Sequence, residues 1–168
     1  RRRYYLRYFT IMSHAKNKVE WCLRKAEKEL KETGKHRGLV KIQPNKALAL
    51  EHLNKANHDL KGAVNFAETG YSDWSASAFF YSMYQCFLAI ATKIGYASGN
   101  QECTFALIYS LIEDGKIDFP KELLDKVTAL ESKKEKENST TTEIREQYQY
   151  GTELSIEDNL YQELLSLA

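Results

Sequence analysis

The chain has 168 residues, of which 43% are hydrophobic and 28% are charged, a composition that excludes intrinsic disorder and fits one globular domain. Only two prolines and eight glycines interrupt it, which favours long helices over a many-stranded sheet. The net charge is +1, but the charges are unevenly distributed along the chain. Residues 1–46 contain 14 Lys and Arg and 4 Asp and Glu, whereas the remaining residues contain 10 Lys and Arg and 19 Asp and Glu. Such polarity either steers an acidic partner or nucleic acid to the basic arm or lets that arm fold against its own acidic body.

The chain opens on RRRYYLRYFTI, a basic segment with no small-residue cleavage site after it. We interpret residues 1–11 as an upstream extension or cloning remnant, and assign 1–12 to an N-terminal extension, 13–44 to a basic helix with a linker, and 45–168 to the main helical bundle. The longest apolar stretch, residues 74–94, is interrupted by serines, a glutamine and a lysine. It indicates a buried core helix instead of a membrane span, so we expect a cytoplasmic protein with no membrane partner.

The three cysteines, Cys22, Cys86 and Cys103, are odd in number and form no C-x-x-C pair. This pattern predicts buried free thiols in a reducing compartment, not a disulfide framework or a zinc site. His52 and His58 lie six residues apart, so they do not share a helix face as metal ligands would. We therefore expect no metal and no cofactor.

The first predicted helix begins at Ser13, a good N-cap, and ends at Gly34. Its apolar residues recur every three or four positions and predict one buried stripe, formed by Val19, Cys22, Leu23, Ala26 and Leu30. The charged opposite face either meets solvent or contacts nucleic acid. Residues 35–44 follow as a linker that ends at Pro44.

Asn45 can cap a second helix that runs to about residue 69 and closes at Gly70. Its predicted inward face comprises Leu53, Ala56, Leu60, Ala63, Val64 and Ala67. A third helix follows over residues 74–96, with Ser72 or Asp73 as its cap. It is apolar on nearly every side, so we expect it at the bundle centre, where its serines and alanines allow neighbouring helices to approach closely.

Three more helices are predicted in the C-terminal half. They cover residues 102–113, residues 121–134 after Pro120, and residues 156–168 after Ser155. Residues 133–142 are polar and carry mixed charge, which predicts a loop. The whole pattern predicts an all-α, up-and-down bundle of four or five helices with an additional N-terminal helix.

Residues 56–96, ANHDLKGAVNFAETGYSDWSASAFFYSMYQCFLAIATKIGY, together with REQYQYG at 145–151, resemble the HEPN family (higher eukaryotes and prokaryotes nucleotide-binding). The matching features are the A-x3-L-x2-A helix, the G-Y-x2-W turn and the F-F-Y-S-M-Y run, and the resemblance spans about residues 47–168. It implies a bundle that is usually dimeric. It also implies, in many members, a metal-independent ribonuclease that works as a toxin beside a nucleotidyltransferase antitoxin.

The family's site is an Arg followed four to six residues later by a His, because RNA cleavage needs a proton carrier near neutral pH and a fixed cation at the phosphate. Here Arg145 is followed by no His, and Tyr150 stands in that position. A tyrosine has a pKa of about 10 and moves protons poorly at neutral pH. All four histidines, His14, His36, His52 and His58, lie in the first 58 residues, and the positions that carry Arg and His around the aromatic run in some relatives are Ala78 and Gln85.

The candidate ligand-binding residues are therefore Arg145, Tyr148, Tyr150, Tyr81 and Tyr84. Arg145 could hold a phosphate while a tyrosine stacks on a base, or it could pair with a carboxylate while the tyrosines pack. Tyr81, Tyr84 and Trp74 recur at helical spacing and are interpreted as core residues, with a tyrosine hydroxyl that lines a dimer cleft as the functional alternative.

We therefore expect a non-catalytic or degenerate module that binds a nucleotide, RNA or a partner protein. Its expected partners are a second copy of itself, as a homodimer, and a nucleotidyltransferase in a toxin–antitoxin-type system. One alternative is a metal-independent ribonuclease with an Arg-x4-Tyr site, formed by Arg145 and Tyr150. The other is a structural adaptor that docks a protein partner.

Overall fold

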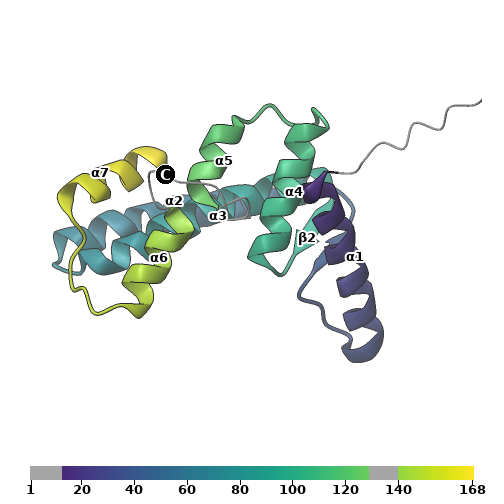
Figure 1. Ribbon diagram of the computed structural model, residues 1–168, viewed down its shortest axis with the longest axis horizontal. Helices are drawn as coiled ribbons and strands as arrows, with labels where there is room; N and C mark the ends of the chain where they lie inside the picture. Colours follow the sequence, from purple (N-terminus) through teal and green to yellow (C-terminus); the bar gives the residue numbers. More distant parts are fainter. Residues whose placement is uncertain (1–12, 129–139) are drawn as a thin grey trace, which may run out of the picture.

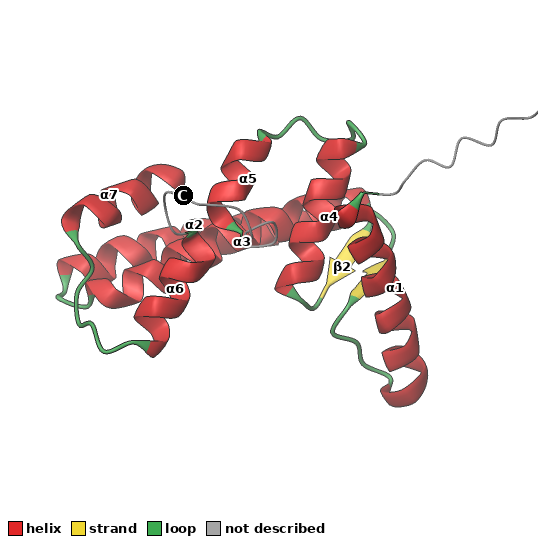
Figure 2. Ribbon diagram, in the orientation of Figure 1, coloured by secondary structure: helices red, strands yellow, loops and turns green. Residues whose placement is uncertain are grey.

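A computed structural model describes residues 13–128 and 140–168 (Figures 1 and 2). Its elements in chain order are α1 (His14–Thr33), β1 (Leu39–Lys41), α2 (Lys46–Glu68), α3 (Ser72–Ile94), β2 (Tyr96–Ser98), α4 (Gln101–Glu113), α5 (Lys121–Val127), α6 (Thr141–Tyr150) and α7 (Asp158–Leu167). The predicted all-α class is confirmed.

The central unit is an antiparallel pair, α2 and α3, held together by small residues at seven-residue spacing. Ala49, Ala56 and Ala63 are buried on α2, and Ser75, Ser82 and Ala89 are buried on α3. The Ser75 hydroxyl donates to the Ala63 carbonyl at 2.7 Å, and the Ser82 hydroxyl donates to the Ala56 carbonyl at 2.9 Å. These two bonds fix the register, and the small side chains permit the close approach that the sequence predicts.

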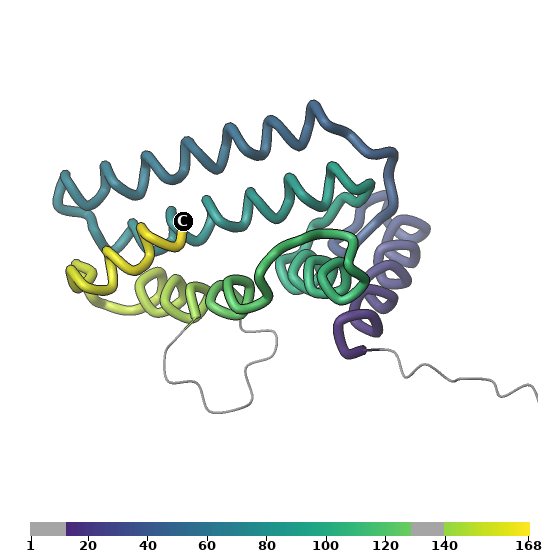
Figure 3. Tube along the Cα trace, turned by 90° about the horizontal axis from the view of Figure 1, so that it is seen from above, coloured from purple at the N-terminus to yellow at the C-terminus, as the bar shows by residue number. Residues whose placement is uncertain are grey.

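α3 lies in the middle of the molecule, with α2 on one side and the shorter helices α4 to α7 on the other (Figure 3). Its aromatic side chains form the core: Phe79 meets Tyr161 of α7, while Phe80 and Phe87 both meet Phe105 of α4 edge-on. The expectation that α3 is covered on every side is wrong, because Trp74 is 53% exposed. Leu53 of α2, expected inward, is also exposed, since α2 packs against α3 along its narrow alanine stripe.

α1 forms an arm that packs on α4 and on β1, at the opposite end of the molecule from α7 (Figure 1). The segment expected to be a linker contains β1, which pairs antiparallel with β2 so that Val40 lies opposite Ala97. The expectation of free thiols is wrong for two of the three cysteines, because Cys22 of α1 and Cys103 of α4 form a disulfide. The two positions lie 81 residues apart, and only the fold shows that they meet.

Two C-terminal expectations also need correction. The fifth helix ends at Val127 rather than near residue 134, with Thr128 in extended conformation. The predicted loop 133–142 lies mostly outside the described residues, but Thr141 and Thr142 already belong to α6, a helix that the sequence reasoning missed. Thr140 and Glu143 form a capping box at its start.

Candidate functional site

Arg145 lies on the buried side of α6, where that helix packs against α3. Its guanidinium sits 4.8 Å from the ring centre of Phe80, and its side chain is only 9% exposed. Nη1 donates to Gln149 Oε1 at 3.2 Å and Nη2 to Glu146 Oε1 at 3.1 Å. Nε is buried and has no partner among the described residues. The guanidinium is therefore a packed cation with little surface left for a phosphate.

The two tyrosines that follow Arg145 lie in different surroundings. Tyr148 is buried, and its pKa is raised by that burial and by the nearby charge of Glu157. Tyr150 ends α6 with 76% of its surface exposed. Because Arg145 is buried and Tyr150 points into solvent, the two do not form a joint site in this chain.

Tyr84 stacks on Phe80, the same ring that Arg145 contacts, with 6.0 Å between the two ring centres. Its hydroxyl bonds to the Thr104 hydroxyl at 3.1 Å, and burial raises its pKa. Tyr81 meets Phe80 edge-on but keeps 37% of its surface exposed. The structure thus brings Arg145, Tyr81 and Tyr84 around one phenylalanine, of which only Tyr81 reaches solvent.

Tyr81 also lines a groove between α2 and α3, of about 450 Å³, which we call the α2–α3 groove. Its lining residues are Lys55, Asp59, Phe66, Trp74, Ser77, Ala78, Tyr81 and Gln85. The lining is mostly aromatic or small, and its two charges form an ion pair between Lys55 and Asp59. Gln85 Oε1 accepts a 2.7 Å hydrogen bond from His52 Nδ1. Ala78 and Gln85 carry neither the cation nor the imidazole that the HEPN resemblance leads us to look for at these positions.

A second cavity, of about 580 Å³, lies where α4 and α6 begin. Its lining residues are Gly99, Asn100, Gln101, Glu102, Phe105, Thr128, Thr142, Glu143 and Glu146. Helix starts favour anions, but three carboxylates here oppose them. Each of these carboxylates has a partner within the chain. Glu102 lies 2.8 Å from Lys18, and Glu143 accepts a 2.7 Å hydrogen bond from the Thr140 amide. Glu146 pairs with Arg145. The cavity is therefore unsuited to a phosphate.

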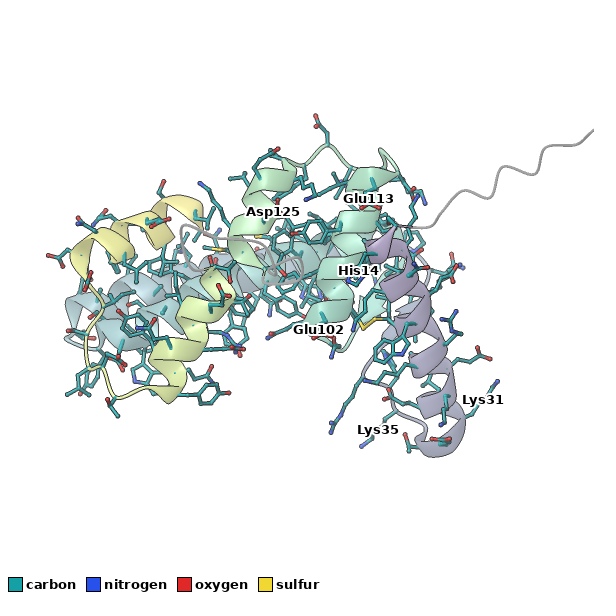
Figure 4. The ribbon with its side chains drawn as sticks, in the orientation of Figure 1. His14, Lys31, Lys35, Glu102, Glu113 and Asp125 are labelled. Atoms are coloured by element: carbon teal, nitrogen blue, oxygen red, sulfur yellow. A yellow bond between two sulfur atoms is a disulfide. The ribbon has the colours of Figure 1, made fainter. Side chains whose placement is uncertain are left out.

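The basic face of α1 is largely paired within the chain. Lys16 contacts Asp114 at 2.5 Å, and this hydrogen-bonded pairing raises the pKa of Lys16 and lowers that of Asp114. Lys18 reaches Glu102, which Figure 4 shows at the end of α4 beside α1. Further ion pairs lie along α1 itself, among them Lys31 with Glu27 at 2.7 Å. Of the two readings of the charge polarity, the described residues favour the arm that folds against its own acidic body.

Neither a membrane-spanning helix nor a cluster of metal-ligating side chains occurs in residues 13–128 and 140–168. Comparison with protein-family models, curated proteins and solved structures gave no match. The HEPN resemblance therefore remains an expectation from the residues themselves.

Sequence reasoning missed the groove residues Phe66 and Asp59 and treated Trp74 as core. A signal was present: Phe66 and Trp74 flank the Gly70 turn, and each lies about 80° around its helix from the small-residue stripe. Side chains at this angle lie beside the contact between the two helices and not within it.

Proposed function

We propose that this chain is a HEPN-like, non-catalytic binding module that acts through protein contact at the α2–α3 groove, with a second copy of itself as the partner. The observation that carries the proposal is the group of exposed apolar side chains around this groove. Trp74 is 53% exposed and Phe66 and Tyr81 are 37% exposed each. Contiguous exposed apolar patches, and aromatic residues above all, mark protein-binding surfaces.

The charges of the groove favour a second copy over an acidic or basic partner. A contact between identical patches must be complementary to itself. Lys55 and Asp59 lie one turn apart on α2 and form an ion pair, so their opposite charges cancel within the groove. Two copies related by a two-fold axis between these positions would place Lys55 of each beside Asp59 of the other.

The ribonuclease alternative has less support. Its cation, Arg145, is stacked on Phe80 and bonded to Gln149 and Glu146, while Tyr150 lies apart from it in solvent. Within residues 13–128 and 140–168, α1 also offers RNA little unpaired positive charge, because its own glutamates and α4 pair with part of it. A protein contact needs neither a free cation nor a proton carrier.

Sedimentation velocity over a range of protein concentrations tests the proposal. Wild type should form a dimer, and Trp74→Asp should shift it to monomer because a carboxylate is costly in an apolar contact. Leu154→Asp is the matched control: Leu154 is 82% exposed but lies outside the groove, so this variant should dimerise like wild type. Circular dichroism would establish that each variant is folded.

A charge-swap pair tests the register. Lys55→Asp should weaken the dimer by placing carboxylates opposite each other, and Lys55→Asp with Asp59→Lys should restore it. A wild type that stays monomeric at every concentration would exclude a second copy as the partner. A dimer unaffected by Trp74→Asp would move the interface away from the groove. RNA cleavage that Arg145→Ala abolishes would support the ribonuclease alternative instead.

A further inference from the structure

The arm helix α1 has a thin apolar contact with the rest of the molecule. Its buried residues are Ala15, Cys22 and Ala26, all of them small. Of its larger apolar side chains, Val19 and Leu23 pack against the core but are only partly buried, and Trp21 and Leu30 are exposed. Since hydrophobic stabilisation scales with the apolar area removed from water, this contact contributes little for a helix of 20 residues.

The other noncovalent links between α1 and α4 are polar and partly solvated. Among the described residues they include the Lys16–Asp114 and Lys18–Glu102 ion pairs and a 2.5 Å hydrogen bond from the Ser13 hydroxyl to Glu113. Ion pairs between partly exposed side chains stabilise only weakly, because water and salt screen their attraction. None of them would hold a helix in place alone.

The Cys22–Cys103 disulfide is the covalent link between α1 and α4, and both of its residues are fully buried. The chain between α1 and β1 can serve as a hinge, because Gly34 has a φ of 71° with open space around it. β1 is held separately through its pairing with β2. For α1 to swing away while β1 stays paired with β2, it must also break its contact with β1 and the 2.6 Å hydrogen bond from the Arg37 amide to Glu29.

We propose that the Cys22–Cys103 disulfide is a redox latch that keeps α1 docked on α4. A dithiol reductant opens it when local opening of α1 exposes the buried sulfurs. One thiolate attacks a cystine sulfur and releases the other cysteine as a thiol, and the second thiol then closes the reductant into its own disulfide. Two electrons and two protons pass to Cys22 and Cys103. In the reduced chain α1 leaves α4 and uncovers the α4 surface around Cys103, while α2 and α3 keep their structure. This latch is independent of contacts at the α2–α3 groove.

Thiol alkylation and hydrogen exchange on the full chain test the latch. The oxidised protein is unfolded in denaturant without reductant and then alkylated. Two of its three cysteines should remain unmodified. Dithiothreitol should then increase exchange in α1 peptides about a hundredfold, the change expected for losing a constraint of disulfide strength. Peptides from α2 and α3 should exchange as before.

The controls use the cysteines themselves. The double variant Cys22→Ser, Cys103→Ser should behave without reductant as reduced wild type does. Cys86→Ser should match wild type in both states, because Cys86 is not bonded. Three reactive thiols in the oxidised protein, unchanged α1 exchange after reduction, or an equal loss of protection in every helix would each overturn the latch.

Discussion

Arg145 shows how the surroundings of one residue decide its role. The HEPN resemblance leads us to expect a phosphate-binding arginine at this position, but in the fold the Arg145 guanidinium covers Phe80. A guanidinium is weakly hydrated and planar, so it stacks on an aromatic ring at less cost than an ammonium would. Its neighbours on α6, Glu146 and Gln149, take two of its donors. We therefore assign Arg145 to the packing of α6 on α3.

This assignment predicts opposite outcomes for two substitutions. Arg145→Ala removes the ring contact and the packing of the side-chain stem, and should lower the free energy of unfolding by about 2 kcal/mol. Arg145→Met refills the space without a charge to desolvate, and should stay within about 1 kcal/mol of wild type. Glu146 loses its ion pair with Arg145 in both variants, but its side chain is 56% exposed and stays hydrated. Urea unfolding followed by circular dichroism measures both, and equal losses would show that the charge itself matters.

Tyr84 makes the stability of the fold sensitive to alkaline pH. Burial raises its pKa above the ordinary value of about 10, although the hydrogen bond with Thr104 works in the opposite direction. The folded state therefore holds this proton more tightly than the unfolded state. Its contribution is complete below about pH 10 and is lost as the pH rises through the folded pKa.

Tyr84→Phe should reduce this alkaline loss. At neutral pH the variant should be about 1 kcal/mol less stable, since one buried hydrogen bond is missing while Thr104 still bonds to the Asn100 carbonyl. Unfolding free energies at neutral pH and above pH 10 should therefore lie closer together in the variant than in wild type. Tyr148 and Tyr161, whose pKa values are also raised, would keep part of the slope. Parallel pH profiles would contradict the role given to Tyr84.

The pairing of α2 with α3 depends on the small residues between them. Periodicity and caps predicted both helices, because Asn45 and the Gly70 turn are local signals. Leu53 was assigned inward because a periodic apolar pattern does not reveal how narrow a contact is. The strand β1 and the helix α6 were missed since a three-residue strand and a polar ten-residue helix both lack clear periodicity. The Cys22–Cys103 bond could not be predicted, because its residues are brought together by the fold. The groove was indicated only by the positions of Phe66 and Trp74 beside the small-residue stripe.

A large side chain in the α2–α3 contact should be costly. In Ala56→Leu the added atoms meet Ser82, whose hydroxyl bonds to the Ala56 carbonyl, so the helices must separate. We expect a loss of about 2–3 kcal/mol in unfolding free energy, typical of an overpacked core. Asn57→Leu is the matched control, because Asn57 is exposed on the same helix and the change should cost less than about 0.5 kcal/mol. Similar losses in both variants would argue against the close contact at Ala56.

The molecule as a whole combines a basic arm with an acidic body, and the two meet. Lys16 and Lys18 on α1 are paired with Asp114 and Glu102 near the two ends of α4. The disulfide joins the same two helices (Figure 4). Part of the opposite charge on the arm and the body is therefore paired within the molecule. The α2–α3 groove is nearly neutral and holds the largest group of exposed aromatic side chains in the described chain.

This distribution predicts how the protein should respond to RNA. Any binding should be weak and should fall steeply with salt, because it would come from scattered surface cations that displace counterions. Arg24→Ala removes such a cation from α1, where the side chain is 68% exposed, and should reduce binding at low salt. Arg145→Ala should leave binding unchanged, since the guanidinium is covered by Phe80. Fluorescence anisotropy with a labelled mixed-sequence RNA measures both variants, and a gel of the same samples reports cleavage. A loss of affinity specific to Arg145→Ala would mean that the guanidinium leaves its ring to reach the phosphate, and the packing role would then be wrong.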